Sequence, residues 1–142
     1  MKIGIIGAGQ IGATLVRQYS KAGHRLKMTN SSGIEKLSGL ALETGASAVT
    51  LSGVVIDVEV VVIAIPLIAI LKLPKQLFKN ASASTIIVDT SRGSWGHHSR
   101  QLKELNIGKV LGRRNNIFIC LLAMVQLKNW HKNSLQFYLK SG

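Results

Sequence analysis

Residues 1–12, MKIGIIGAGQIG, decide the fold that we expect for this chain. Ile3, Ile5 and Ile6 form a short apolar run that predicts a buried strand. The run leads into a G-x-G-x-x-G pattern at residues 7–12, and an amphipathic segment typical of a helix follows. A strand, a glycine turn and a helix in this order are the context in which the pattern predicts dinucleotide binding.

Each glycine of this pattern has a separate physical purpose. Gly7 permits a sharp turn, Gly9 lets a pyrophosphate approach the backbone, and Gly12 lets the helix pack closely on the sheet. The free N–H groups and the dipole of the helix start would then attract the phosphates. A tight turn without a ligand is the less favoured alternative. The predicted cofactor-binding residues of the turn are Gly7, Ala8, Gly9, Gln10, Ile11 and Gly12.

Length and composition fit one soluble globular domain. The chain has 142 residues, of which 46% are hydrophobic and 17% are charged. Its single cysteine, Cys120, excludes an internal disulfide framework and fits a reducing compartment, so we expect a cytoplasmic protein. No signal peptide is expected, because glycines interrupt the first apolar run. Of two other apolar stretches, residues 53–71 contain acids and a proline, and residues 117–125 are too short to span a membrane.

The positive charge lies mainly in the last third of the sequence. The formal net charge is +12, and residues 1–91 contribute +4 (nine basic, five acidic). Residues 92–142 contribute +8, from nine basic residues and one acid. A nucleic-acid partner is therefore an alternative for this third, but no recognisable nucleic-acid-binding motif accompanies the charge, and we do not favour it.

The sequence after the second predicted strand favours NADP over NAD. That strand covers residues 25–29, and the segment after it is where a dinucleotide fold meets the adenosine ribose. NAD-selective sites usually carry an acid there, whereas the first acid of this segment is Glu35. Hydroxyls and a lysine would instead hold a 2′-phosphate. The Ser32–Glu35 spacing also predicts a capping box for the next helix, and the two interpretations are compatible. The candidate contacts are Asn30, Ser31, Ser32 and Lys36, with Lys27 nearby.

Further segments complete an alternating pattern of strands and helices. The β-branched run at residues 58–65 predicts a central parallel strand that is buried on both faces. Ala64, Ile65 and Pro66 end it beside the expected ligand crevice, either as cofactor contacts or as a simple strand terminator. Thr90, after a strand at residues 85–89, is another candidate cofactor contact. The other expected elements are a strand at 48–50 and helices at 10–22, 34–44 and 67–77, the last interrupted near Pro74.

We therefore expect an α/β fold over residues 1–91, a Rossmann-like doubly wound parallel sheet with helices on both faces. Asp89 is more simply a capping or backbone-binding carboxylate than an acid–base residue. We nominate no catalytic residue.

Three stretches resemble the NADP-binding domain of the coenzyme F420-dependent NADP oxidoreductase family: MKIGIIGAGQIGATLVRQYSKAGH, TNSSGIEKL and VVVIAIP. The resemblance covers about residues 1–91, and Ser32 replaces an arginine typical of the family. It implies that Ser31, Ser32 and Lys36 contact the 2′-phosphate. It also implies that Gly9, Gln10 and Ile11 contact the pyrophosphate, and that Ala64, Ile65 and Pro66 line the nicotinamide side.

Residues 92–142 do not match this family, which suggests a truncated or sequence-shifted C-terminal segment. Residues 109–111 predict a sixth strand, and residues 118–139 predict a long helix suited to a homodimer surface. His97 and His98 lack the spacing of metal ligands, so we expect no metal site. Cys120 is expected to be a buried small hydrophobe.

The predicted function is hydride transfer between NADP and a small-molecule acceptor of the flavin or deazaflavin (F420) type. Such an acceptor stacks on the nicotinamide, so the reaction requires no side-chain acid or base. The alternative from a different class is an NADP-binding or regulatory module without turnover.

Overall fold

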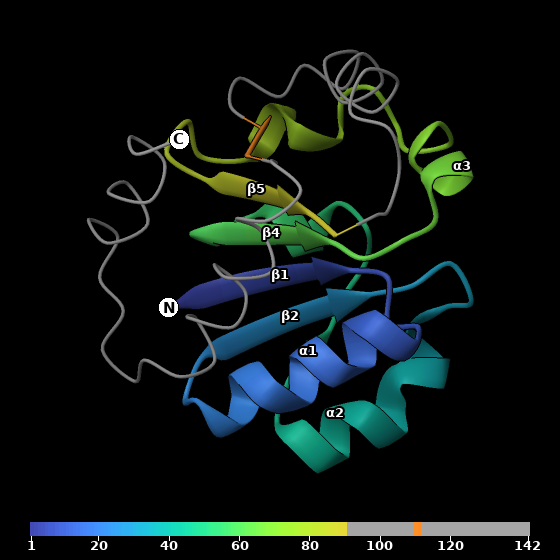
Figure 1. Ribbon diagram of the computed structural model, residues 1–142, viewed down its shortest axis with the longest axis vertical. Coiled ribbons are helices and arrows are strands. Elements are labelled where there is room, and N and C mark those ends of the chain that lie inside the picture. Colours follow the sequence, from blue (N-terminus) through green and yellow to red (C-terminus); the bar gives the residue numbers. More distant parts are fainter. Residues whose placement is uncertain (91–109, 112–142) are drawn as a thin grey trace.

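The computed structural model describes residues 1–90 and 110–111, and these form one parallel β-sheet with helices on both faces (Figure 1). The sheet has six strands in the order β3-β2-β1-β4-β5-β6. This arrangement confirms the predicted Rossmann-like doubly wound fold. The strands are β1 (Lys2–Ile6), β2 (Arg25–Thr29), β3 (Ser47–Ala48), β4 (Val60–Ile63), β5 (Ile86–Asp89) and β6 (Val110–Leu111).

Strand β1 lies in the middle of the sheet, at the point where the strand order reverses. The chain proceeds outward from β1 to β2 and β3, and then returns to place β4 on the other side of β1. In-register parallel pairs join β1 to both neighbours, with Ile5 opposite Met28 on one side and Val62 on the other. Open α/β sheets bind their ligands outside the carboxyl ends of the strands at such a reversal.

The helices are α1 (Gln10–Lys21), α2 (Ser38–Thr44) and α3 (Leu67–Ile70), and three short 3₁₀ helices accompany them. Gly23 and Gly45 follow α1 and α2 with φ angles of 82° and 71°, so both predicted helix ends are confirmed. The predicted helix at 34–44 is divided into a 3₁₀ turn and α2. The 3₁₀ helices are η1 (Ile34–Leu37), η2 (Gly53–Val55) and η3 (Leu77–Asn80).

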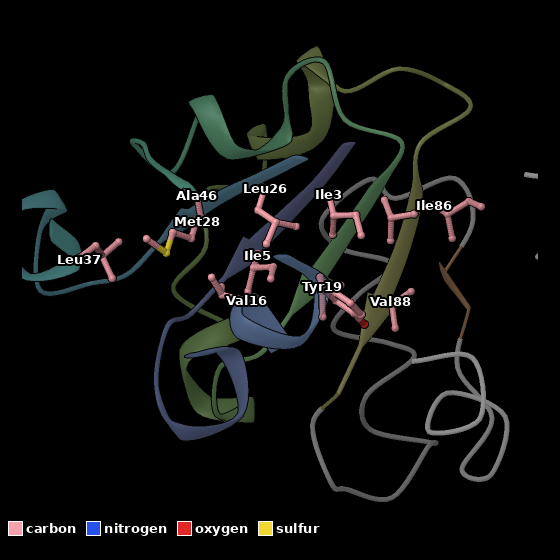
Figure 2. Packing of buried hydrophobic residues seen from close by; sticks show 12 residues of the cluster. Ile3, Ile5, Val16, Tyr19, Leu26, Met28, Leu37, Ala46, Ile86 and Val88 are labelled. Atoms are coloured by element: carbon pink, nitrogen blue, oxygen red, sulfur yellow. The ribbon is translucent and has the colours of Figure 1, made fainter. Parts of the chain in front are cut away.

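The hydrophobic core has two layers, one on each face of the sheet. All four residues of β4 are fully buried, as predicted for a central strand, and they alternate between the layers. Figure 2 shows the layer under α1, in which the Val16 and Tyr19 side chains lie against the sheet. Ile70 of α3 and the Leu77–Phe78 pair of η3 belong to the opposite layer.

Gly4 allows η2 to pack directly against β1. A Cβ atom on Gly4 would lie 2.2 Å from the carbonyl oxygen of Val54, far inside van der Waals contact. The glycine therefore sets the distance between the 3₁₀ helix and the sheet. The sequence marks Gly4 only as an interruption of an apolar strand, because its partner is fifty residues away.

The predicted helix at 67–77 is wrong beyond Ile70. The N–H groups of Lys72 and Leu73 donate to Ala69 and Ile70 in tight turns, and the chain then reaches Pro74. Proline lacks an N–H, its ring clashes with the carbonyl four residues earlier, and it disfavours a helical residue before it. The helix therefore ends early.

Other element boundaries differ by a few residues. Strand β3 is Ser47–Ala48 instead of 48–50, and β4 is Val60–Ile63 instead of 58–65. The sixth strand is confirmed at Val110–Leu111, which pairs in parallel with β5. The predicted dimerising helix at 118–139 lies outside the described residues.

Candidate functional site

The turn between β1 and α1 is held by the ends of the two neighbouring strands. The N–H of Gly7 donates to the carbonyl of Thr29 at the end of β2, at 2.9 Å. The N–H of Ala64, just after β4, donates to the carbonyl of Ile6 at 2.8 Å. The turn is therefore fixed over the point where the strand order reverses.

Two glycines of the turn are required by steric contact. Gly7 has a φ angle of 97°, and a Cβ there would lie 2.6 Å from the carbonyl oxygen of Ala64. A Cβ on Gly12 would lie 1.7 Å from the carbonyl oxygen of Gly7. These contacts agree with a sharp turn at Gly7 and with close packing of the helix at Gly12.

Gly9 differs from both, because its missing side chain leaves open space. Apart from its neighbours in the chain and the backbone of its own helix, no atom of the described residues lies within 4 Å of the position that a Cβ would occupy. Gly9 is the N-cap of α1, no side chain caps the helix start, and its first turn holds no acid. Gln10 and Ile11 are exposed beside it, and Ala8 is half-buried. The backbone at this point is open to an anion, and the first turn of α1 adds no carboxylate that would compete with it.

The ends of β4 and β5 form the other side of the site. Ala64 and Ile65 are half-buried and Pro66 is exposed. A Cβ on Gly7 would lie 2.4 Å from Cγ2 of Ile65, so this segment is in contact with the glycine turn. Thr90 donates twice to the carbonyl of Ile63, from its N–H at 3.0 Å and from its hydroxyl at 3.1 Å. The predicted residues that follow both strands therefore lie together at the edge of the sheet where the strands have their carboxyl ends, which we call the carboxyl edge.

The segment after β2 presents hydroxyls and one cation to solvent. Ser31, Ser32 and Lys36 are exposed, and none of them has a hydrogen bond or ion pair within residues 1–90 and 110–111. Asn30 is half-buried, and its Oδ1 atom is buried without a hydrogen-bond partner. Glu35 of η1 is the first acid after the strand.

The predicted capping box is wrong. Gly33, with φ 96° and ψ 157°, is the N-cap of η1, and no side chain caps that helix. Ser32 stands one residue too early, because the positive φ of Gly33 turns the chain before the helix begins. The Ser32 hydroxyl is consequently left for solvent or a ligand.

Lys27 does not belong to the site. Its ammonium group donates to the carbonyl of Ile56 at 2.7 Å and more weakly to that of Gly53 at 3.5 Å. The neighbouring residues Leu26 and Met28 face the layer under α1, so Lys27 faces the opposite side of the sheet. The sequence places it near the second strand's end but carries no signal for this distant partner.

Two exposed ion pairs lie away from the site and lower the pKa values of the carboxyl groups that take part in them. A hydrogen bond from Arg17, at 2.7 Å, lowers the pKa of the Glu43 carboxyl between α1 and α2. A hydrogen bond from Lys2 lowers the pKa of Asp57 at the opposite edge of the sheet. These pairs join elements of the fold and take no part in the carboxyl edge.

Among residues 1–90 and 110–111, no three His, Cys, Asp or Glu side chains gather in a way that could hold a metal ion, and His97, His98 and Cys120 lie outside the described residues. The same residues include no helix long and apolar enough to cross a membrane. The predicted site residues that the structure describes supply backbone amides, apolar side chains, side-chain amides, hydroxyls and one lysine.

Solved dehydrogenases and reductases share the fold. An arogenate dehydrogenase from Synechocystis is 22% identical with a TM-score of 0.64, covering 73% of this chain and 37% of its own. A D-lactate dehydrogenase from Escherichia coli is 28% identical with a TM-score of 0.57, covering 77% and 35%. An imine reductase from Aspergillus terreus, solved in complex with NADPH4, is 20% identical with a TM-score of 0.59, covering 77% and 38%.

The chain spans little more than a third of the length of these three proteins. No curated protein matches it. The family described as NADP oxidoreductase, coenzyme F420-dependent, matches residues 2–93, which is the part that carries the glycine turn and the strand ends around it. The chain therefore belongs to the coenzyme F420-dependent NADP oxidoreductase family.

Proposed function

We propose that this chain binds NADP(H) and transfers a hydride between it and an acceptor of the flavin or deazaflavin type. The observation that carries the proposal is the open backbone at Gly9. There, α1 begins without a side-chain cap and without an acid in its first turn, and the space beside Gly9 is open among the described residues. This helix start follows β1, the strand at which the strand order of the sheet reverses. A pyrophosphate fits this position because it needs N–H donors and close backbone approach.

The segment after β2 supports NADP as the nucleotide. Ser31, Ser32 and Lys36 offer two hydroxyls and an ammonium group, and all three are exposed and unpaired in the described structure. A 2′-phosphate accepts hydrogen bonds from such groups, whereas an acid at this place would repel it. The family assignment supports the same nucleotide.

The residues of the chain bind and orient the cofactor. The nicotinamide supplies the carbon that gives or takes the hydride, and this chemistry belongs to the cofactor. The Ala64–Pro66 segment would hold the ring in place from the end of β4, and Thr90 fixes that end through its two bonds to Ile63. No catalytic acid or base is required, since ring-to-ring hydride transfer needs only alignment.

A calorimetric titration of the purified chain with NADPH and NADH tests the nucleotide. We expect tighter binding of NADPH, and we expect Gly9→Val to abolish binding of both. Gly39→Val in α2 is the matched control, because a Cβ on Gly39 likewise meets no atom within 4 Å among the described residues outside its own helix and chain neighbours. Undiminished NADPH binding in Gly9→Val would refute the site.

A second candidate is an NADP-binding or regulatory module without turnover. The glycine turn and the hydroxyls and lysine after β2 would hold a nucleotide whether or not an acceptor binds beside it, and this favours the second candidate. NADPH oxidation in the presence of flavin, deazaflavin and quinone acceptors separates the two candidates. Nucleotide binding without any oxidation would support the module.

A further inference from the structure

Two asparagines lie in the part of the chain that the structure describes, Asn30 and Asn80. Asn30 precedes Ser31 in a turn directly after β2, whereas Asn80 is the last residue of η3 and precedes Ala81. Asparagine is chemically labile, because the backbone nitrogen of the next residue can attack its side-chain amide. The two asparagines differ in how the structure holds that nitrogen.

The backbone nitrogen of Ser31 is not held by a hydrogen bond. Ser31 is exposed, and its N–H donates to no residue in 1–90 or 110–111. The chain is fixed just before it, where the carbonyl of Thr29 accepts the N–H of Gly7. It turns just after it, at Gly33, which has a φ angle of 96°. Rotation of the backbone at Ser31 therefore breaks no hydrogen bond among the described residues.

The side-chain amide of Asn30 is not held either. Its Oδ1 atom is buried without a partner, and no hydrogen bond of this side chain occurs within the described ranges. An unpaired buried acceptor costs free energy, so the amide gains nothing from its present orientation. Both reacting groups are therefore available to each other, since they belong to adjacent residues.

Asn80 has the opposite arrangement. The N–H of Ala81 donates to the carbonyl of Phe78 at 3.1 Å, at the C-terminal end of η3. The nitrogen beside Asn80 must break this bond before it can attack, although Asn80 itself is exposed. The hydrogen bonding of the following nitrogen therefore distinguishes the two asparagines, and exposure of the side chain does not.

We propose that Asn30 is a site of self-modification, at which the side-chain amide is lost by deamidation. The Ser31 nitrogen attacks Cγ of Asn30, the new N–Cγ bond closes a cyclic imide, and the Cγ–Nδ2 bond breaks. The proton of the attacking nitrogen leaves with the amide group as ammonia. Water then opens the imide at either carbonyl, which gives aspartate or isoaspartate at position 30. The reaction needs only water and involves no change of oxidation state.

The product carries a carboxylate at the place where we propose that the 2′-phosphate binds. An acid at the end of the second strand is the usual mark of an NAD-selective site, and its charge repels a 2′-phosphate. Deamidation should therefore lower the affinity for NADPH and spare that for NADH. This consequence rests on the proposed function, whereas the deamidation itself does not.

Peptide mapping of the purified chain tests the modification. The chain is incubated at mildly alkaline pH and sampled over time. Trypsin then releases residues 28–36 and 80–92 as two peptides, each with a single asparagine. Mass spectrometry detects the exchange of –NH2 for –OH. We expect Asn30 to convert about tenfold faster than Asn80, because attack at Asn80 first requires the Ala81 hydrogen bond to open.

Two controls separate the effect of the structure from that of the local sequence. Ala81→Ser gives Asn80 the same two following residues as Asn30 and keeps the backbone bond to Phe78, so Asn80 should remain slow. Unfolding this variant in urea frees both nitrogens, and Asn30 and Asn80 should then convert at equal rates. Conversion of Asn30 only in urea, or equal rates in the folded variant, would overturn the inference.

Calorimetry with NADPH and NADH, before and after conversion, tests the consequence. We expect about tenfold weaker binding of NADPH and less than about twofold for NADH, and Asn30→Asp should reproduce both changes. A converted chain with an unchanged ratio of affinities would contradict the proposed place of the 2′-phosphate and support the modification. An unconverted Asn30 in a chain that binds NADPH would contradict the modification alone.

Discussion

The backbone of Gly7 occupies the space that a side chain on Gly12 would need. A Cβ on Gly12 would lie 1.7 Å from the carbonyl oxygen of Gly7 and 3.6 Å from the Cβ of Ala64. Helix α1 therefore packs against the turn that precedes it with no room for a methyl group. This contact sets the direction in which the helix start faces the carboxyl edge.

Gly12→Ala should consequently destabilise the fold. Because the opposing atom is backbone, the helix must move, and we expect a loss of about 2–3 kcal/mol in the free energy of unfolding. Urea denaturation measures it. Gly39→Ala, in α2, has open space and should be neutral or slightly stabilising. Equal stability of the two variants would contradict the packing described.

The double variant Ser31→Ala/Lys36→Ala should lose affinity for NADPH selectively. Both side chains are exposed and unpaired, so the change removes candidate phosphate contacts without disturbing the fold. We expect about a tenfold weaker binding of NADPH and less than about twofold for NADH, measured by calorimetry. Equal losses for both nucleotides would remove the 2′-phosphate assignment.

Lys27→Met should affect stability but not nucleotide selectivity. It removes the donor to the Ile56 carbonyl, a bond of 2.7 Å, and should cost about 1 kcal/mol of unfolding free energy. The ratio of NADPH to NADH affinity should stay at the wild-type value. A changed ratio would show that Lys27 reaches the nucleotide after all.

Acidification should weaken the two ion pairs of the fold. The hydrogen bond from Lys2 lowers the pKa of Asp57 from its ordinary 3.8, and that from Arg17 lowers the pKa of Glu43 from its ordinary 4.5. A carboxylate whose pKa is lowered on folding stabilises the folded chain fully above its ordinary pKa. This stabilisation is lost as the pH falls through the lowered pKa. Both pairs are exposed, so the effect should be small.

The variant Asp57→Asn/Glu43→Gln isolates this effect. Its urea midpoint should lie below that of the wild-type chain at pH 7, and the difference should shrink at pH 3, where the wild-type carboxylates approach protonation. A difference that is the same at both pH values would assign the stabilisation to something other than charge.

The sequence by itself determined the strand–turn–helix at residues 1–21, the buried β4 and the helix ends at Gly23 and Gly45. These features depend on the local conformational limits of glycine and on runs of apolar side chains, which a short window of residues contains. The sequence also carried the family resemblance over about residues 1–91, and the family match over residues 2–93 confirms it.

Only the tertiary structure decided which distant groups meet. Gly4 packs on Val54, Lys27 binds the carbonyl of Ile56, and Ile65 reaches the glycine turn at Gly7. Pairs like these lie many residues apart, and the sheet brings them together. Local preference therefore predicts the elements, while long-range packing determines the surroundings of each side chain.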